Sequence, residues 1–146
     1  MIEKIIDNQS IQTYSYRFLQ LISENEHNIG TNFAQGADGI NRMYVNVNLP
    51  NLPNNARIKK ATLKLKQTAS NLLGVNTKIG LFEFYGSLSE GEFSIGGEGP
   101  TIDYVSVSDE ADAEYTFDIT KLIRFAAIAD TSEIRIETRG RFYCPP

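Results

Sequence analysis

Alternation of apolar and polar residues is the main pattern along the chain. From Met43 to Leu49 every second residue is apolar, with tyrosine or asparagine between, and residues 61–66 alternate alanine or leucine with threonine or lysine. Successive side chains of a strand point to opposite faces, so this spacing predicts strands with one buried and one solvated face. Other runs with full or partial alternation are residues 11–24, 78–86, 101–108, 114–120 and 133–139.

Turn-forming segments separate these predicted strands. They are rich in glycine, proline, asparagine and serine, and they lie at residues 49–56, 70–77, 90–100 and 129–132. Short strands joined by turns, without alternating helices, predict an antiparallel β-sandwich or barrel. We therefore expect one all-β domain over residues 1–146, in which residues 1 to about 12 form an N-terminal arm or a pairing strand, with a neighbouring molecule as one candidate partner.

Residues 115–130 change their period without an intervening glycine or proline. Alternation up to Ile119 gives way to a group of apolar residues spaced as on one side of a helix. A strand that runs directly into a short helix predicts a cover for one open end of the sandwich. The side chains expected to seal this end are Leu122, Ile123 and Phe125, with Asp118 or Thr120 capping the first helical amides and Lys121 and Arg124 in water.

Composition narrows the possible partners. The 146 residues carry a net charge of −4, which argues against nucleic acid, and no apolar run approaches the roughly 18 residues of a membrane span. The basic segment 57–66 is interpreted as the solvated face of a strand, with a polyanion contact as the alternative. The first residues lack a signal-peptide pattern, so we expect a protein that works where it is made, is assembled into a particle, or has lost a signal.

Residues with catalytic or metal-binding chemistry are sparse. The single cysteine, Cys144, and the single histidine, His27, are far apart, and His27 is expected at the surface. The acidic residues Asp109, Glu110 and Asp112 are interpreted as a solvated loop, with calcium binding as the alternative. Residues 96–100 contain GGEGP but lack the lysine of a phosphate loop. We therefore expect no enzyme, no metal and no cofactor.

Two candidate roles fall on one predicted strand. Tyr44, Asn46 and Asn48 share its polar face and form a candidate sugar-binding platform, although scattered surface tyrosines would give the same pattern. Arg42, at the head of the strand, is expected to have a structural role in an ion pair with Asp118.

Three segments resemble a known family. They are residues 41–67 (NRMYVNVNLPNLPNNARIKKATLKLKQ), residues 115–127 (YTFDITKLIRFAA) and residues 23–39 (SENEHNIGTNFAQGADG), and their spacing is similar to that of DNRLRE-type domains. The resemblance implies a jelly-roll β-sandwich related to carbohydrate-binding modules, of the kind found in secreted, cell-surface and phage-encoded proteins. The letters that give the family its name are absent here. The chain also stops at residues 139–146, where the family has a further strand, which implies an open sheet edge.

These observations predict a non-enzymatic structural or attachment module. We expect a virion component, such as a phage capsid decoration or tail protein, or a part of a surface assembly, located in the virion or at the cell surface. Its expected partners are copies of itself or other structural proteins, joined by strand addition at the open edge, and a glycan as a further ligand. The alternative is a carbohydrate-binding module from a larger bacterial extracellular protein.

Overall fold

The computed structural model describes residues 11–27, 29–31, 40–50, 57–68, 76–95, 99–107, 110 and 112–143. The elements within these residues are mostly strands, with one short helix. In chain order they are β1 (Ile11–Arg17), β2 (Gln20–Ser23), β3 (Gly30–Thr31), β4 (Ile40–Asn48), β5 (Thr62–Lys66), β6 (Asn76–Glu83), β7 (Gly91–Glu92), β8 (Thr101–Ser106), β9 (Glu114–Asp118), α1 (Thr120–Ile128) and β10 (Glu133–Tyr143).

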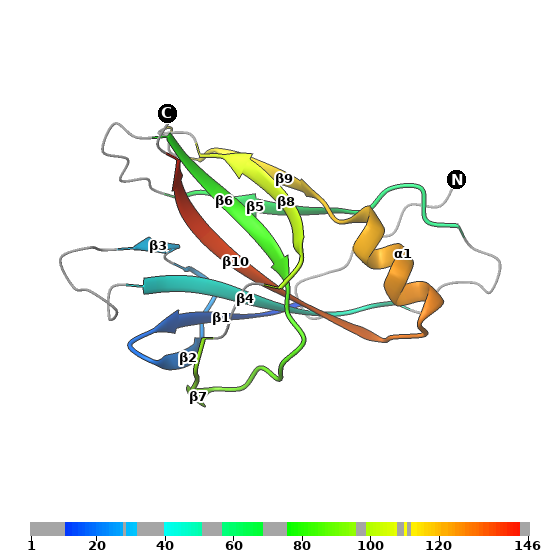
Figure 1. Ribbon diagram of the computed structural model, residues 1–146, viewed down its shortest axis with the longest axis horizontal. Coiled ribbons are helices and arrows are strands. Elements are labelled where there is room, and N and C mark those ends of the chain that lie inside the picture. The colour runs from blue at the N-terminus through cyan, green and yellow to red at the C-terminus, as the bar shows by residue number, and fades with distance from the viewer. Residues whose placement is uncertain are drawn as a thin grey trace.

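Two antiparallel sheets form the body of the molecule (Figure 1). The main sheet has the strand order β7-β2-β1-β4-β10-β6-β8, with the short β3 also paired to β4, and the second sheet consists of β5 and β9. The predicted all-β sandwich is confirmed. Of the predicted N-terminal arm, Ile11 and Gln12 belong to β1 and pair with β4, while residues 1–10 lie outside the described residues.

The strand pairing is nested in the manner of a jelly roll. β4 pairs with β10, β5 with β9, and β6 with β8, each antiparallel. A long two-stranded ribbon wound around a core gives this order, because each strand of the first half meets its counterpart from the second half. The expected jelly-roll sandwich follows from these three pairings.

The inner face of the main sheet and the second sheet enclose an apolar core. Alternate residues of β4 and β10 face Tyr115 and Phe117 of β9, while Leu63 and Leu65 of β5 pack at the margin. The buried members from the main sheet are Met43, Val45, Val47, Leu81, Ile134 and Ile136. Burial of each such side chain contributes on the order of 2 kcal/mol, so this core stabilises the contact between the sheets.

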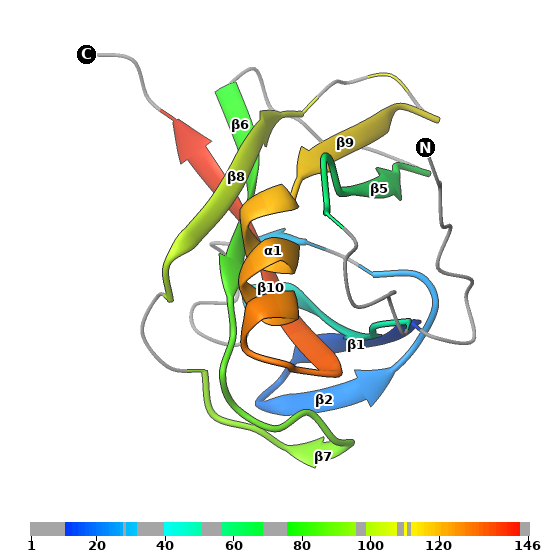
Figure 2. The ribbon, with the colours of Figure 1, turned by 90° about the vertical axis from the view of Figure 1, so that its right-hand side faces the viewer.

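Helix α1 covers one end of this core, as predicted. Figure 2 shows it lying across the end of the molecule, between the β8–β9 side and the β1–β2 side. Ile119, Leu122, Ile123 and Ala126 recur at helical spacing and pack against the core. The Oδ1 atom of Asp118 accepts hydrogen bonds from the Thr120 amide, at 3.0 Å, and from the Thr120 hydroxyl, at 2.6 Å. The N-cap position itself is occupied by Ile119, which makes no side-chain capping hydrogen bond, so neither Asp118 nor Thr120 is the N-cap residue.

The other face of the main sheet, here called the outer face, is also covered. After β6 the chain crosses this face through residues 84–95, and this crossing segment includes β7, which pairs with β2. Phe84, Leu88, Phe93 and Ile95 of the crossing segment pack on a cluster of Tyr16, Leu21 and Tyr44. The main sheet is therefore buried on both faces at its centre.

Candidate functional site

A charged network occupies the outer face where β4 and β10 pair. Tyr44 lies opposite Glu137 in the register, and its hydroxyl donates to Oε2 of Glu137 at 2.5 Å. Nε of Arg139 donates to Oε1 of the same carboxylate, and Nη1 of Arg42 lies 3.8 Å from that oxygen. Glu137 and Arg139 are buried. The carboxylate thus has three partners, as a buried charge requires.

Two cations share one carboxylate in this network. Burial and the neighbouring Glu137 carboxylate raise the pKa of Tyr44 well above its usual range, so Tyr44 stays a hydrogen-bond donor. Nη1 of Arg42 is buried and has no hydrogen-bond partner. The guanidinium of Arg139 also lies over the ring of Phe82, 5.1 Å from its centroid. These contacts fasten the central strands of the sheet and bring no reactive group to the surface.

The predicted partner of Arg42 is wrong. Arg42 pairs with Glu137 on the outer face, whereas the carboxylate of Asp118 is exposed and is occupied by Thr120 at the start of α1. The Thr120 hydrogen bonds lower the pKa of Asp118 below its usual value. Arg42 has the same parity along β4 as Tyr44, which directs both side chains away from the inner core and towards β10.

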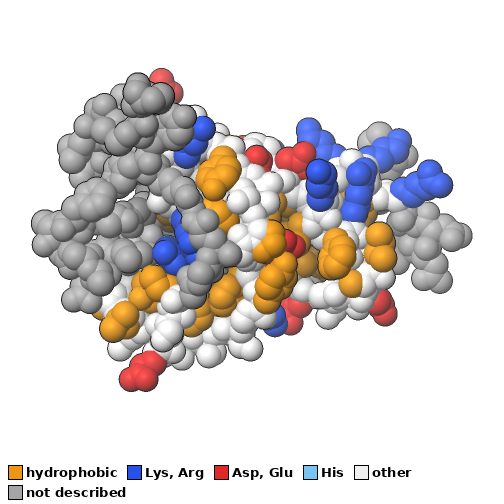
Figure 3. Space-filling model, in the orientation of Figure 1, with side chains coloured by type: hydrophobic (Ala, Val, Ile, Leu, Met, Phe, Trp, Pro, Cys, Tyr) orange, Lys and Arg blue, Asp and Glu red, His pale blue; other side chains and the backbone are white. Residues whose placement is uncertain are grey.

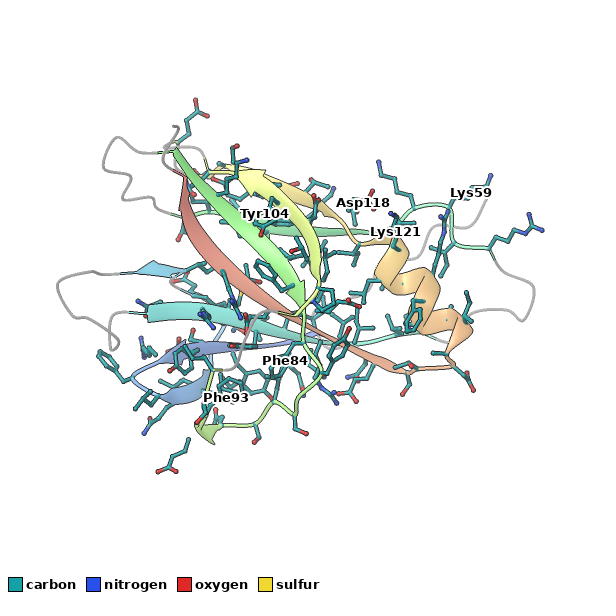
Figure 4. All side chains as sticks on the ribbon, viewed as in Figure 1. Lys59, Phe84, Phe93, Tyr104, Asp118 and Lys121 are labelled. Atoms are coloured by element: carbon teal, nitrogen blue, oxygen red, sulfur yellow. The ribbon has the colours of Figure 1, made fainter. Side chains whose placement is uncertain are left out.

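The predicted sugar platform of Tyr44, Asn46 and Asn48 is also not a surface. Tyr44 is 0% exposed and Asn46 is buried, while Asn48 is exposed. The rings of Phe84 and Phe93 each lie edge-on to Tyr44 with centroids 5.1 Å away (Figure 4). The apolar residues Leu88, Phe93 and Ile95, which follow the predicted strand 78–86, were the available signal, because a solvated loop does not need them.

Tyr104 of β8 lies on the outer face and remains accessible, with 38% of its surface exposed. Its ring packs over Gly80 of β6, where a Cβ atom would lie 2.6 Å from Cε1 of Tyr104. It also meets the ring of Phe82 edge-on, at a centroid distance of 5.8 Å. Glycine at position 80 therefore lets an aromatic ring lie close against the sheet and stay partly open to solvent (Figure 4).

Phe125 does not seal the end of the sandwich as predicted. Leu122 packs against the core, but Phe125 is 68% exposed and Ile128, one turn further along α1, is 85% exposed. At about 100° per residue, the core-facing arc centres on Leu122, Ile123 and Ala126, which leaves Phe125 on the outer side of the helix. Phe125 and Ile128 form an exposed apolar pair, here called the α1 pair.

Ser15 and His27 have the residue types of a nucleophile and its base. Oγ of Ser15 lies 2.6 Å from Nδ1 of His27, and burial lowers the pKa of His27 against a smaller opposing effect of Glu24. Ser15 is buried, and among the described residues Nε2 of His27 has no hydrogen-bond partner. The described part of the chain thus gives this pair neither an exposed serine nor a further side chain that orients the histidine as in a catalytic triad. His27 is half-buried, not at the surface as predicted.

The acidic loop is partly tied to β5. Asp112 pairs with Lys66 at 3.9 Å, and the backbone carbonyl of Glu110 accepts a hydrogen bond from Nε2 of Gln67 at 2.8 Å. Asp109 and Cys144 lie outside the described residues. Among the residues that are described, no group of three or more histidine, cysteine or acidic side chains is arranged to hold a metal ion.

Comparison with known proteins adds no family to this picture. No protein-family model matches the chain, and no curated protein is significantly similar to it. Within the part of the chain that the structure describes, no helix is both long and apolar enough to cross a membrane.

Proposed function

We propose that the protein is a non-enzymatic assembly or attachment module, of the kind used in a virion or at a bacterial surface. The α1 pair is the observation that supports this most directly. Phe125 and Ile128 are held outwards on a helix whose opposite side is fixed in the core. Large apolar side chains presented together on a rigid element are typical of a contact surface with another protein.

The turn between β1 and β2 supports the same proposal. Its two residues, Phe18 and Leu19, have positive φ angles of 51° and 63°, and each is 59% exposed. Tight hairpins of this kind favour asparagine and glycine, because bulky side chains strain the left-handed backbone. Two large apolar residues at such a tip carry both a conformational and a solvation cost, which contact with a partner would offset. The turn and α1 lie towards opposite ends of the long axis (Figure 1).

Sheet edges give a second route to assembly. Within the described chain, β5 pairs only with β9, so its other edge has backbone groups to offer a partner's strand. Lys64 and Lys66 alternate along β5 and point outwards, which limits unspecific pairing without preventing a specific one. The expected completion of an open edge by a neighbouring copy thus remains part of the proposal.

Size-exclusion chromatography with light scattering tests the assembly function. The wild-type chain is expected to form a closed oligomer, and the variant Phe125→Ser/Ile128→Ser is expected to be a folded monomer. Tyr85→Ser is the matched control, because Tyr85 is also a highly exposed ring but follows β6 and is not part of α1. A wild-type protein that stays monomeric at every concentration would refute assembly through the α1 pair.

The alternative function is carbohydrate binding, and Tyr104 favours it. A tyrosine ring packed on glycine and partly open to solvent can stack on the apolar face of a sugar. In a glycan array this reading predicts binding that disappears in Tyr104→Ala and persists in Tyr85→Ala. Binding that is indifferent to Tyr104 would remove the observation that favours it.

A further inference from the structure

We infer that the end of the sandwich beside the start of α1 binds an acidic polysaccharide. The inference rests on the attachment function proposed above and names the class of surface polymer to which the module attaches. The binding surface, here called the basic end, consists of Arg57, Lys59, Lys60, Lys121 and Arg124, all of which are exposed. Figure 3 shows lysine and arginine side chains gathered at this end of the molecule.

Positive and negative charges are unevenly distributed along the chain. Residues 57–66 and 118–124 contain seven of its 14 lysines and arginines but one of its 18 acidic residues. These 17 positions therefore carry a net charge of +6, and the remaining chain carries −10. A local excess of this sign on an acidic protein indicates a specific anionic partner, since solubility alone would be served by the acidic surface.

The fold brings these two segments together and fixes them. Nε of Arg124 donates to the carbonyl of Ile58 at 2.7 Å, and its Nη2 donates to the carbonyl of Lys59 at 3.1 Å. The Ala61 amide donates to the hydroxyl of Thr120 at 3.0 Å. The backbone of the segment that carries Lys59 is thus bound to the first two turns of α1, so the positions from which its cations project are fixed before any ligand arrives.

Among the described residues, Asp118 is the acidic group whose charge acts on the basic end, through Lys60 and Arg124, and the lysines of this end form no ion pair. Lys64 and Lys66, further along β5, each lie 3.9 Å from a carboxylate of Glu114 and Asp112 respectively. No described carboxylate forms such an ion pair with Lys59, Lys60 or Lys121. Asp118 lies beside Lys121 in the view of Figure 4, with Lys59 further along the same end, and its Oδ1 atom already accepts two hydrogen bonds from Thr120.

The surroundings favour an acidic polysaccharide over nucleic acid. Duplex DNA carries about one charge per 1.7 Å of its axis, a denser array than the one carboxylate per sugar of a polyuronate, so the charge of −10 on the rest of the chain repels DNA more strongly. Single strands are bound by several rings on which successive bases stack. Beside the basic end α1 offers one exposed ring, Phe125, four residues after Lys121. A lysine next to one ring suits a uronate, which has a carboxylate and an apolar sugar face.

Binding of fluorescent polygalacturonate to the full-length protein tests the inference. The wild type is expected to bind it, to release it at high salt, and to ignore neutral dextran. Lys59→Gln/Lys60→Gln is expected to weaken binding about tenfold. Lys64→Gln/Lys66→Gln is the matched control, because it changes the net charge equally on the same segment, and less than about threefold weakening is expected.

Three outcomes would overturn the inference. They are no binding of polygalacturonate by the wild type, equal weakening by the two double variants, and tighter binding of single-stranded poly(dT) than of polygalacturonate. The last outcome would indicate a nucleic-acid partner. Light scattering on the same samples separates this result from the assembly function: an intact oligomer without polymer binding removes the polysaccharide and leaves assembly standing.

Discussion

The two faces of strand β4 are both buried, but by different means. Its inner face presents Met43, Val45 and Val47 to an apolar core. Its outer face presents Arg42 and Tyr44 to a network of charges and rings beneath the segment that follows β6. The inner face is stabilised by removing apolar area from water, whereas the outer face depends on every buried charge having a partner. The two faces of one alternating strand can therefore be buried by very different interactions.

Truncation of the inner core is expected to have the largest effect. Phe117→Ala removes a fully buried ring between the two sheets and should lower the free energy of unfolding by about 4 kcal/mol. Tyr85→Ala, at a highly exposed ring outside the core, is the control and should change it by less than about 0.5 kcal/mol. Urea denaturation measures both, and similar losses would mean that Phe117 contributes no more to stability than an exposed ring.

Neutralising the outer network is expected to cost somewhat less. Glu137→Gln removes the carboxylate that Tyr44 and Arg139 contact and leaves buried guanidinium groups without an anion. The expected loss is about 3 kcal/mol in the free energy of unfolding. Glu133→Gln, on the same strand but in a partly exposed pair with Arg135, should cost below about 1 kcal/mol. Equal effects would show that the outer face is solvated.

The two faces of β4 also show which features of the fold could be predicted from the sequence and which could not. Alternation located β4, β5 and β9, and the loss of alternation after Ile119 located α1, because both periods follow from backbone geometry alone. The cover over the outer face could not be found in this way, since residues 84–95 pack through tertiary contacts and have no regular period. Glu137 was hidden for a related reason: a charge on an alternating strand normally marks solvent, and only the register with Tyr44 shows its partner.

The sequence was also insufficient to predict which residues of α1 face the core. The apolar group in residues 122–128 spans more of the helix circumference than the core can bury, so hydropathy alone placed Phe125 among the buried residues.

The basic end could be predicted only in part. Its cations were visible in segment 57–66, but their junction with Lys121 depends on the hydrogen bonds of Arg124 and Thr120.

A smaller change in the free energy of unfolding is expected from a substitution at Thr138, in the inner core. Thr138 is fully buried among apolar residues, and its hydroxyl has no hydrogen-bond partner. Thr138→Val removes this unsatisfied group at nearly constant shape, so the protein should gain up to about 1 kcal/mol in unfolding free energy. Thr116→Val, on the exposed side of β9, is the comparison and should be neutral. A clear destabilisation by Thr138→Val would mean that the hydroxyl has a partner, such as a buried water.

The smallest expected effect is a pH dependence centred on His27. Burial lowers its pKa in the folded state below the ordinary value of 6.5. The unfolded chain therefore binds a proton more readily, so stability is full above pH 6.5 and falls as the pH drops towards the folded-state pKa. Urea denaturation at a series of pH values should show this loss in the wild type and a flatter profile in His27→Gln. Identical profiles would place His27 in solvent.

Hydroxyl-radical footprinting tests the central claim, that contacts are made at the ends of the sandwich and not on the face of its main sheet. Tyr44 should stay unmodified at all protein concentrations, because it is 0% exposed. Phe125 should react in dilute protein and become protected as the oligomer forms. Ready modification of Tyr44, or a reactivity of Phe125 that does not change on assembly, would contradict the account.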